Sequence, residues 1–163
     1  MIILVADTSV IIDLERGGLL ALALASADRF ATPDVLYDNE LASNVGPELL
    51  RLGLQIVNLD GNEMATVQTL YSSGPLALAD YAALVAARRP DHELLTGDRL
   101  LRQHADRHRV PCHGLLWLLD RIALRSVHTI NALHAGLTTI AAHPRCRLPP
   151  REVQERLRHW KRA

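Results

Sequence analysis

Four carboxylates carry most of the chemistry that this sequence offers. They lie in the segments VADTSVI, DNELAS, LALADYAAL and LLTGDRLL, and they are Asp7, Glu40, Asp80 and Asp98. Asp7 and Asp98 each follow a short, mostly apolar run, at 2–6 and 94–96, of the kind that forms a buried strand of a parallel sheet. Because ligands bind beyond the carboxyl ends of such strands, two acids at two strand exits are expected to meet in one cleft.

Acids gathered in one cleft need a compensating positive charge. Like charges at close range raise one another's pKa, and a hard divalent cation with oxygen ligands is the usual remedy. We therefore expect a metal site in which Asp7 and Asp98 are the first ligands, because strand ends fix their positions. Glu40 and Asp80 are expected to hold metal-bound waters or a second ion, and to orient an attacking water.

The acid at position 80 stands on an unusually apolar helix. Residues 76–88 are nearly all helix formers, and several alanines among them allow close approach to a sheet. A narrow solvated face is the alternative explanation for Asp80. Its apolar neighbours leave little room for such a face, which favours an active-site role.

Hydroxyl and guanidinium groups flank the acids in the sequence. Ser9 and Thr96 are expected to orient carboxylates or to contact phosphate, with ordinary turn hydrogen bonding as the alternative for each. Arg99 and Arg102 follow Asp98 within about one helical turn. They are candidates for binding phosphate, or else they face solvent.

Alternating strand and helix patterns predict an α/β fold with a central parallel sheet. Strands are expected at 2–6, 30–32, 54–59, 94–96 and 110–112, and helices at 14–27, 63–72, 76–88, 99–108, 115–123, 127–142 and 150–160. A further helix should begin after Asp34, with Leu36 and Glu40 pointing the same way. Asp98 is expected at the N-terminus of the helix over 99–108.

Length and composition are those of one globular domain, 1–163. The N-terminal apolar run is short and has no basic leader, so neither a signal peptide nor a membrane-spanning helix is expected. Two cysteines, Cys112 and Cys146, are too few for a disulfide framework. They favour a reducing, cytoplasmic location.

The formal net charge is zero, but the charges are unevenly distributed. Residues 1–80 hold eleven acids and three arginines, whereas residues 81–163 hold seven acids and fifteen bases. An acidic pocket beside an arginine-rich rim suits a metal-dependent enzyme that acts on a polyanion. A coding bias toward arginine is the alternative, since Lys161 is the only lysine.

Taken together, the motifs resemble the PIN-domain family. The resemblance rests on a first strand ending in D-T-S, a glutamate on the second helix, L-x-x-A-D-Y-A, and L-L-T-G-D-R-L-L-R followed by V-P-x-x-G-L-L-W-L-L. It covers about residues 1–125 and is strongest to VapC-type toxins and their relatives, some of which carry a helical C-terminal extension like that expected over 126–163. Asp7, Glu40, Asp80 and Asp98 match the family's acidic quartet, and Ser9 and Thr96 match the adjacent hydroxyls.

The resemblance implies a three-layer α/β/α sandwich, Mg²⁺ or Mn²⁺ bound by the acids, and hydrolysis of RNA phosphodiesters. It further implies the toxin of a type II toxin–antitoxin module, inhibited by a protein antitoxin. Two alternatives stay open: an RNA-processing nuclease outside such a pair, and a PIN module that binds RNA or protein without cutting. The complete acidic quartet disfavours the second.

Two further expectations concern local structure and assembly. The family commonly has Ser or Thr three residues before the third acid, where this chain has Ala77; Pro75, expected in the first helical turn, would partly replace the lost cap. The apolar faces of the helices over 115–123 and 127–142 exceed what a small core needs. They therefore predict a homodimer, as the resemblance also does.

Overall fold

The computed structural model describes residues 2–26 and 28–161. Within these ranges, parallel strands form one central sheet in the order β3-β2-β1-β4-β5. The strands are β1 (Ile3–Ala6), β2 (Arg29–Pro33), β3 (Gln55–Val57), β4 (His92–Leu95) and β5 (Cys112–His113). β1 is central, and the chain moves to one side for β2 and β3 and to the other for β4 and β5. This topology places a switch point, where ligands bind in such sheets, beyond the ends of β1 and β4.

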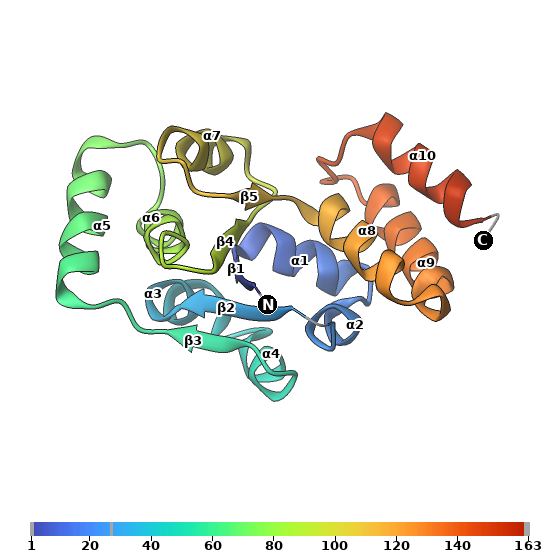
Figure 1. The fold of residues 1–163 in the computed structure, drawn as a ribbon, viewed down its shortest axis with the longest axis horizontal. Coiled ribbons are helices and arrows are strands. Elements are labelled where there is room, and N and C mark those ends of the chain that lie inside the picture. Colours follow the sequence, from blue (N-terminus) through green and yellow to red (C-terminus); the bar gives the residue numbers. More distant parts are fainter. Residues whose placement is uncertain (1, 27, 162–163) are drawn as a thin grey trace.

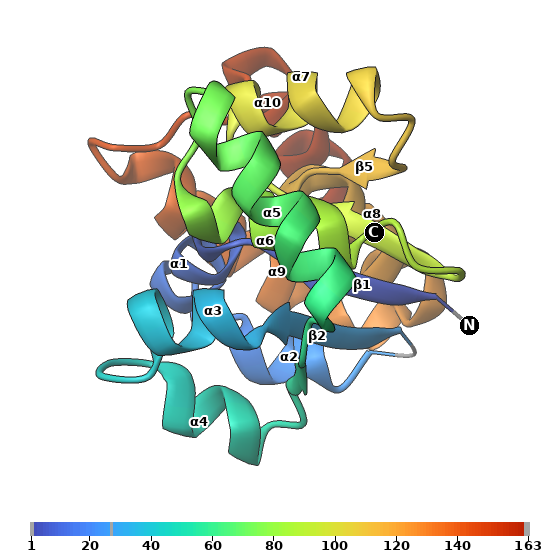
Figure 2. The ribbon, with the colours of Figure 1, turned by 90° about the vertical axis from the view of Figure 1, so that its left-hand side faces the viewer.

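Helices cover both faces of the sheet, which gives the predicted three-layer α/β/α arrangement (Figures 1 and 2). They are α1 (Thr8–Arg16), α2 (Leu20–Leu24), α3 (Asp34–Leu36), α4 (Gly46–Arg51), α5 (Gly61–Ser73), α6 (Leu78–Ala86), α7 (Arg99–Arg107), α8 (Leu115–Arg125), α9 (Ile130–Ala142) and α10 (Pro150–Trp160), with a π-helical turn η1 (Tyr37–Leu41) and a 3₁₀ turn η2 (Val127–Thr129). Among the described residues, no helix combines the length and apolar composition needed to cross a bilayer.

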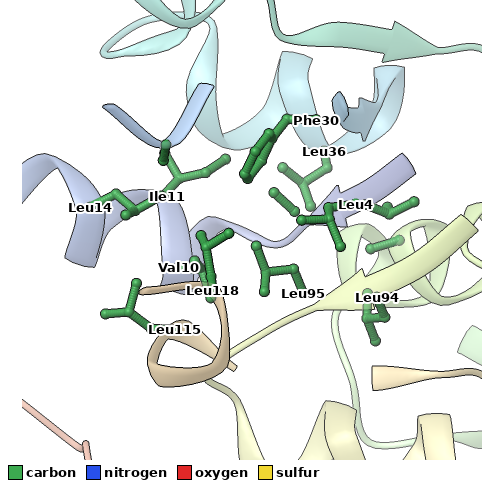
Figure 3. Close-up of a cluster of buried hydrophobic side chains, with 14 of the residues drawn as sticks. Leu4, Val10, Ile11, Leu14, Phe30, Leu36, Leu94, Leu95, Leu115 and Leu118 are labelled. Carbon is green, nitrogen blue, oxygen red and sulfur yellow. The ribbon is translucent and has the colours of Figure 1, made fainter. Parts of the chain in front are cut away.

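The two faces of the sheet are packed by different helices. α6 lies against β1, β2 and β4, and α5 packs on α6 (Figure 2). Ala82, Ala83 and Ala86 of α6 are fully buried, so their small side chains let the helix approach closely. On the opposite face, Figure 3 shows Val10 of α1 and Leu118 of α8 beside Leu95 of β4. Both faces of β1 and β4 are therefore buried, as expected for a parallel sheet.

The C-terminal helices complete this core. Leu133, Leu137 and Ile140 of α9 are fully buried and belong to the same apolar cluster as the sheet. α9 packs on α1 and α10. The contact with α1 is close, because a Cβ atom at Gly136 would lie 2.8 Å from the carbonyl oxygen of Gly17. The chain itself covers most of the apolar faces of α8 and α9, although Leu124 of α8 is 89% exposed, so the homodimer expected from these faces stays a prediction.

Most elements lie within three residues of their predicted bounds, but two features differ more. The helix predicted over 14–27 is broken: α1 ends at Arg16, Gly18 adopts a φ of +64°, and α2 begins at Leu20. A glycine accommodates this left-handed conformation without a Cβ clash, and it turns the chain between the two helices. The predicted end of that helix, Ala27, lies outside the described residues. The second difference is α4, a short helix that the sequence did not predict.

A buried carboxylate ties the start of β2 to α8. Asp28 is 4% exposed and accepts hydrogen bonds from two arginines on successive turns of α8. Arg121 donates to both carboxylate oxygens, at 2.5 and 3.0 Å, and Arg125 donates at 3.0 Å. The hydrogen bonds from Arg121, reinforced by Arg125, hold the pKa of the Asp28 carboxyl below its ordinary value of 3.8.

Asp28→Asn should lower the free energy of unfolding by about 2 kcal/mol at pH 7, because charge-assisted hydrogen bonds are lost in a buried position. The depressed pKa makes this stabilisation fully present above pH 3.8 and progressively lost as the pH falls through the lower folded-state pKa. Urea unfolding at pH 7 and at steps down to pH 3 measures it. Glu155→Gln, which breaks the exposed pair with Arg151, is the control and should change stability by less than about 0.5 kcal/mol. Equal effects of both substitutions would contradict this role of Asp28.

Candidate active site

Strand register brings the first acid to the centre of the site. Ala6 of β1 pairs with Leu95 of β4, so Asp7 and Thr96 come next on adjacent strands. The backbone amide of Asp7 continues the ladder and donates to the Leu95 carbonyl at 3.0 Å. Asp7 is 4% exposed, and α1 begins directly after it. Its carboxylate therefore lies at the sheet edge that the topology marks for ligand binding.

Two hydroxyl groups hold the Asp7 carboxylate. Ser9 Oγ and Thr96 Oγ1 both donate to Asp7 Oδ2, at 2.7 and 2.8 Å. Each hydroxyl also accepts a backbone N–H, Ser9 from Gly97 and Thr96 from Asp98, both at 2.9 Å. Because the amides fix the hydroxyl lone pairs, both hydroxyl protons are directed at Asp7. Ser9 and Thr96 thus orient the carboxylate, and they leave its second oxygen, Oδ1, without a protein donor among the described residues.

Asp98 begins α7, as the sequence predicts. Its Oδ1 accepts the backbone N–H of Leu101 at 2.8 Å, which is an N-cap hydrogen bond, and Oδ2 has no donor within the described ranges. Arg102, one turn later, donates to the carbonyl oxygens of Thr96 at 2.9 Å and Cys112 at 3.4 Å. It therefore holds the turn that carries Thr96 and Asp98, whereas Arg99 is exposed.

Asp80 lies in the first turn of α6. Its Oδ2 accepts the backbone N–H of the N-cap residue Ala77 at 3.0 Å. This is half of a capping box, because alanine has no side-chain acceptor to return the bond. Pro75 does not replace the missing cap. The expectation that it lies in the first turn is wrong, since α6 begins at Leu78, two residues further on than predicted.

Glu40 reaches the site through the π-helical turn η1. The amide of Ala42 donates to the Tyr37 carbonyl five residues earlier, at 2.8 Å. This wider turn changes the direction of the side chains, so that Leu36 is fully buried while Glu40 is exposed. The prediction that the two point the same way is wrong, because it assumed regular α-helical spacing.

Thr8 is a site residue that the sequence reasoning missed. Its hydroxyl donates to Glu40 Oε2, which links the first residue of α1 to the π-helical turn. The only signal was its place between Asp7 and Ser9 in the D-T-S motif. The Thr8 side chain thus holds Glu40, and the Ser9 side chain holds Asp7.

Three of the four carboxylates act electrostatically on the fourth, Asp80. The pKa of Asp80 is raised from 3.8 to about 6, first because burial disfavours the charged form. The charge of Asp7 adds to the rise, and Glu40 and Asp98 contribute further, while the Ala77 amide opposes it. Asp80 therefore experiences the fields of the other three acids, so the structure brings the four predicted residues to one region.

The donor set matches the chemistry of a hard divalent cation. Besides Oδ1 of Asp7 and Oδ2 of Asp98, the second oxygens of Asp80 and Glu40 accept no hydrogen bond from the described part of the protein. Carboxylate oxygens are the ligands that Mg²⁺ and Mn²⁺ prefer. Within residues 2–26 and 28–161, however, no three His, Cys, Asp or Glu side chains are close enough to hold a metal ion as they stand. The residue types fit a divalent metal ion, and binding one would require the carboxylates to move closer together.

Comparison with known families agrees with this geometry. A family model described as a PIN domain matches residues 3–162, so the chain belongs to the PIN-domain family. PIN domains are generally nucleases and typically use divalent metal ions. No curated protein and no solved structure matches the chain.

Asp80→Asn should stabilise the metal-free protein by about 1–2 kcal/mol at pH 7.5, because a neutral amide avoids the cost of a charged group among three other acids. Above pH 6 the folded state alone bears that cost, and the cost disappears once the acid is protonated in both states, below pH 3.8. The gain should therefore shrink to zero by about pH 4. Denaturant unfolding in EDTA at several pH values measures it.

Asp106→Asn is the matched control, because Asp106 is exposed on α7 and is not among the charges that raise the pKa of Asp80. This substitution should change the free energy of unfolding little at any pH. A parent protein that is more stable than Asp80→Asn at pH 7.5 would contradict the electrostatic account of the site.

Proposed function

We propose that the protein is a metal-dependent endoribonuclease that hydrolyses RNA phosphodiesters, with Asp7, Glu40, Asp80 and Asp98 as its catalytic residues. The observation that carries this proposal is the geometry beyond β1 and β4: Ser9 and Thr96 hold Oδ2 of Asp7, and Thr96 also accepts the backbone N–H of Asp98. Burial, and then the charges of the other acids, raises the pKa of Asp80, so a cation here would stabilise the charged carboxylates at neutral pH. Membership of a nuclease family supports the same chemistry.

Asp7 and Asp98 are the residues that would hold Mg²⁺ or Mn²⁺, since both follow strand ends and each has an oxygen that no described residue donates to. When bound, such an ion neutralises charge on a phosphodiester and makes coordinated water more acidic. Ser9 and Thr96 fix the orientation of Asp7. Glu40 and Asp80 would orient the attacking water, Glu40 in a position set by Thr8.

The parent protein should cleave single-stranded RNA in the presence of Mg²⁺ or Mn²⁺, and EDTA should abolish the cleavage. Both ions should also raise the melting temperature, because a ligand of the folded state stabilises it by mass action. Asp7→Asn should abolish that shift and reduce cleavage on the order of 100-fold or more, since metal stabilisation of the transition state is worth several kcal/mol. Asp106→Asn should behave like the parent. Absence of both EDTA-sensitive cleavage and metal-dependent stabilisation in the parent would refute the proposal.

We further propose that the nuclease is the toxin of a toxin–antitoxin pair, with a partner that places an arginine or lysine among the four acids. Charge-assisted hydrogen bonds from such a cation would inhibit by occupying the site. The resemblance to VapC-type toxins is what supports this role over a housekeeping one. A homodimer is supported mainly by the same resemblance, because the chain itself buries most of the apolar faces of α8 and α9 and leaves Leu124 exposed.

Metal and partner should then compete for the acids. Affinity for a partner encoded by an adjacent short reading frame should fall as Mg²⁺ increases, and Asp7→Asn and Asp98→Asn should each weaken it about tenfold or more. Calorimetric titration of the two purified proteins measures this. An affinity that neither Mg²⁺ nor the two substitutions change would place the partner elsewhere and rule out inhibition by occupancy.

A further inference from the structure

The connection between α9 and α10, residues 143–149, lies beside the candidate active site. A cavity of about 250 Å³ is lined on one side by Ser9 and Asp98, and on the other by Arg145 and Arg147 of this connection. The C-terminal extension thus contributes two arginines to the wall of a cavity that begins at the catalytic acids.

A second cavity, of about 450 Å³, continues from the first. Gly97 and Arg147 line both, and the second extends past Arg99 and Trp117 toward the start of α10. In Figure 1, that end of α10 lies on the side of the extension that faces α7 and β5. Because they share Gly97 and Arg147, we treat the two cavities as one groove beside the Asp98 turn.

Alternation along the connection directs its arginines outward. Cys146 and Leu148 are partly buried and pack against the core, whereas Arg145 and Arg147 are exposed. A turn inside the connection and an ion pair of the following helix restrain it. The amide of Cys146 donates to the His143 carbonyl at 2.9 Å, and Arg156 of α10 makes hydrogen bonds of 2.6 to 3.0 Å to Asp120 of α8. The two guanidinium groups are therefore presented from an anchored segment.

The arginines of the groove fall into two groups. Arg16, Arg102 and Arg156 bond to acids or carbonyls of the protein itself. Arg99, Arg145 and Arg147 are exposed, and no ion pair found within 2–26 and 28–161 uses them. Three uncompensated guanidinium groups along one groove suit a ligand with repeated negative charges, such as a phosphodiester chain.

Trp117 is not available to such a ligand as a stacking platform. Its ring is stacked on His113 at 3.8 Å between centroids, and the guanidinium of Arg121 lies 5.1 Å from the ring centroid. Recognition in this groove therefore rests on charge rather than on base stacking, which makes it largely independent of sequence.

We propose that Arg145 and Arg147 bind the phosphates of single-stranded RNA next to the scissile bond, and that Arg99 continues this path. This inference rests on the proposed nuclease function, because it identifies the groove as the substrate path to the acids. The C-terminal extension is then part of the substrate site, and the basic half of the chain supplies its cations.

The test is binding of a fluorescent single-stranded RNA of about 12 nucleotides to the full-length protein in EDTA, measured by anisotropy over a range of salt. The double variant Arg145→Ala/Arg147→Ala should bind at least about tenfold more weakly at low salt. Its slope of log affinity against log salt should be shallower by about 1.4, since each lost phosphate contact on a single strand contributes about 0.7. Arg145→Lys/Arg147→Lys should largely keep the slope, because it keeps the charges.

Arg151→Ala/Arg158→Ala is the matched control, because it removes two exposed arginines from α10 that line neither cavity. It should bind within about twofold of the parent, and melting temperatures should show that both double variants are folded. An equal loss in both would mean that total charge alone matters and would overturn the inference. The inference would also be overturned if polyglutamate, an acidic peptide, bound the parent more tightly than RNA and if that binding depended on Arg145 and Arg147.

Cleavage with Mn²⁺ separates the two proposals. If the parent cleaves RNA and the Arg145→Ala/Arg147→Ala protein binds and cleaves as well as the parent, the inference fails while the nuclease function stands. If the parent binds RNA through these arginines but never cleaves it, the inference about binding stands while the nuclease function fails.

Discussion

Four carboxylates at one edge of a parallel sheet repel one another, and the fold has to keep them there despite that repulsion. It does so by attaching each acid to backbone that cannot easily move. Asp7 and Asp98 follow adjacent central strands, and Asp80 lies in the first turn of the helix that covers those strands. Hydrogen bonds from Ser9, Thr96 and backbone amides then take up one oxygen of each of these three acids. The oxygens that remain are the ones available to a cation.

The same constraint explains several features that would otherwise be unrelated. The π-helical turn brings Glu40 outward to Thr8, although Leu36, just before the turn, is fully buried. Arg102 bonds to carbonyls near the site, rather than to an acid within it, and so stabilises the Thr96 turn without neutralising the acids. Cations are found at the rim instead, where Arg145 and Arg147 line the adjoining cavity. Acids in the centre with arginines around them are the arrangement that a metal-dependent enzyme needs for a polyanionic substrate.

Much of this was predictable from sequence, because the informative residues are tied to strand ends. A buried parallel strand has a strong apolar signal, so the positions of Asp7 and Asp98 relative to β1 and β4 followed from pattern alone. The α/β class and the start of α7 at Asp98 followed in the same way. The start of α10 at Pro150 was marked by its prolines.

What could not be predicted depended on local backbone departures or on contacts between distant segments. A π-helical turn has no characteristic residue preference, so the predicted direction of the Glu40 side chain was wrong. Gly17 and Gly18 lie inside an otherwise helical pattern, which hid the break between α1 and α2. The place of Arg145 beside Asp98 depends on how α9 packs on α1, through Gly17 and Gly136. The burial of the apolar faces of α8 and α9 depends on the same packing, which periodicity along the chain does not reveal.

The central claim is that the four acids form a cation site at the ends of β1 and β4. Anomalous diffraction at the manganese edge, from crystals grown with Mn²⁺, tests it most directly. We expect a manganese peak ligated by Asp7 and by at least one of Glu40, Asp80 and Asp98, and no such peak in crystals of Asp7→Asn. Manganese bound only by other residues, or no manganese at this edge of the sheet in the parent protein, would contradict it.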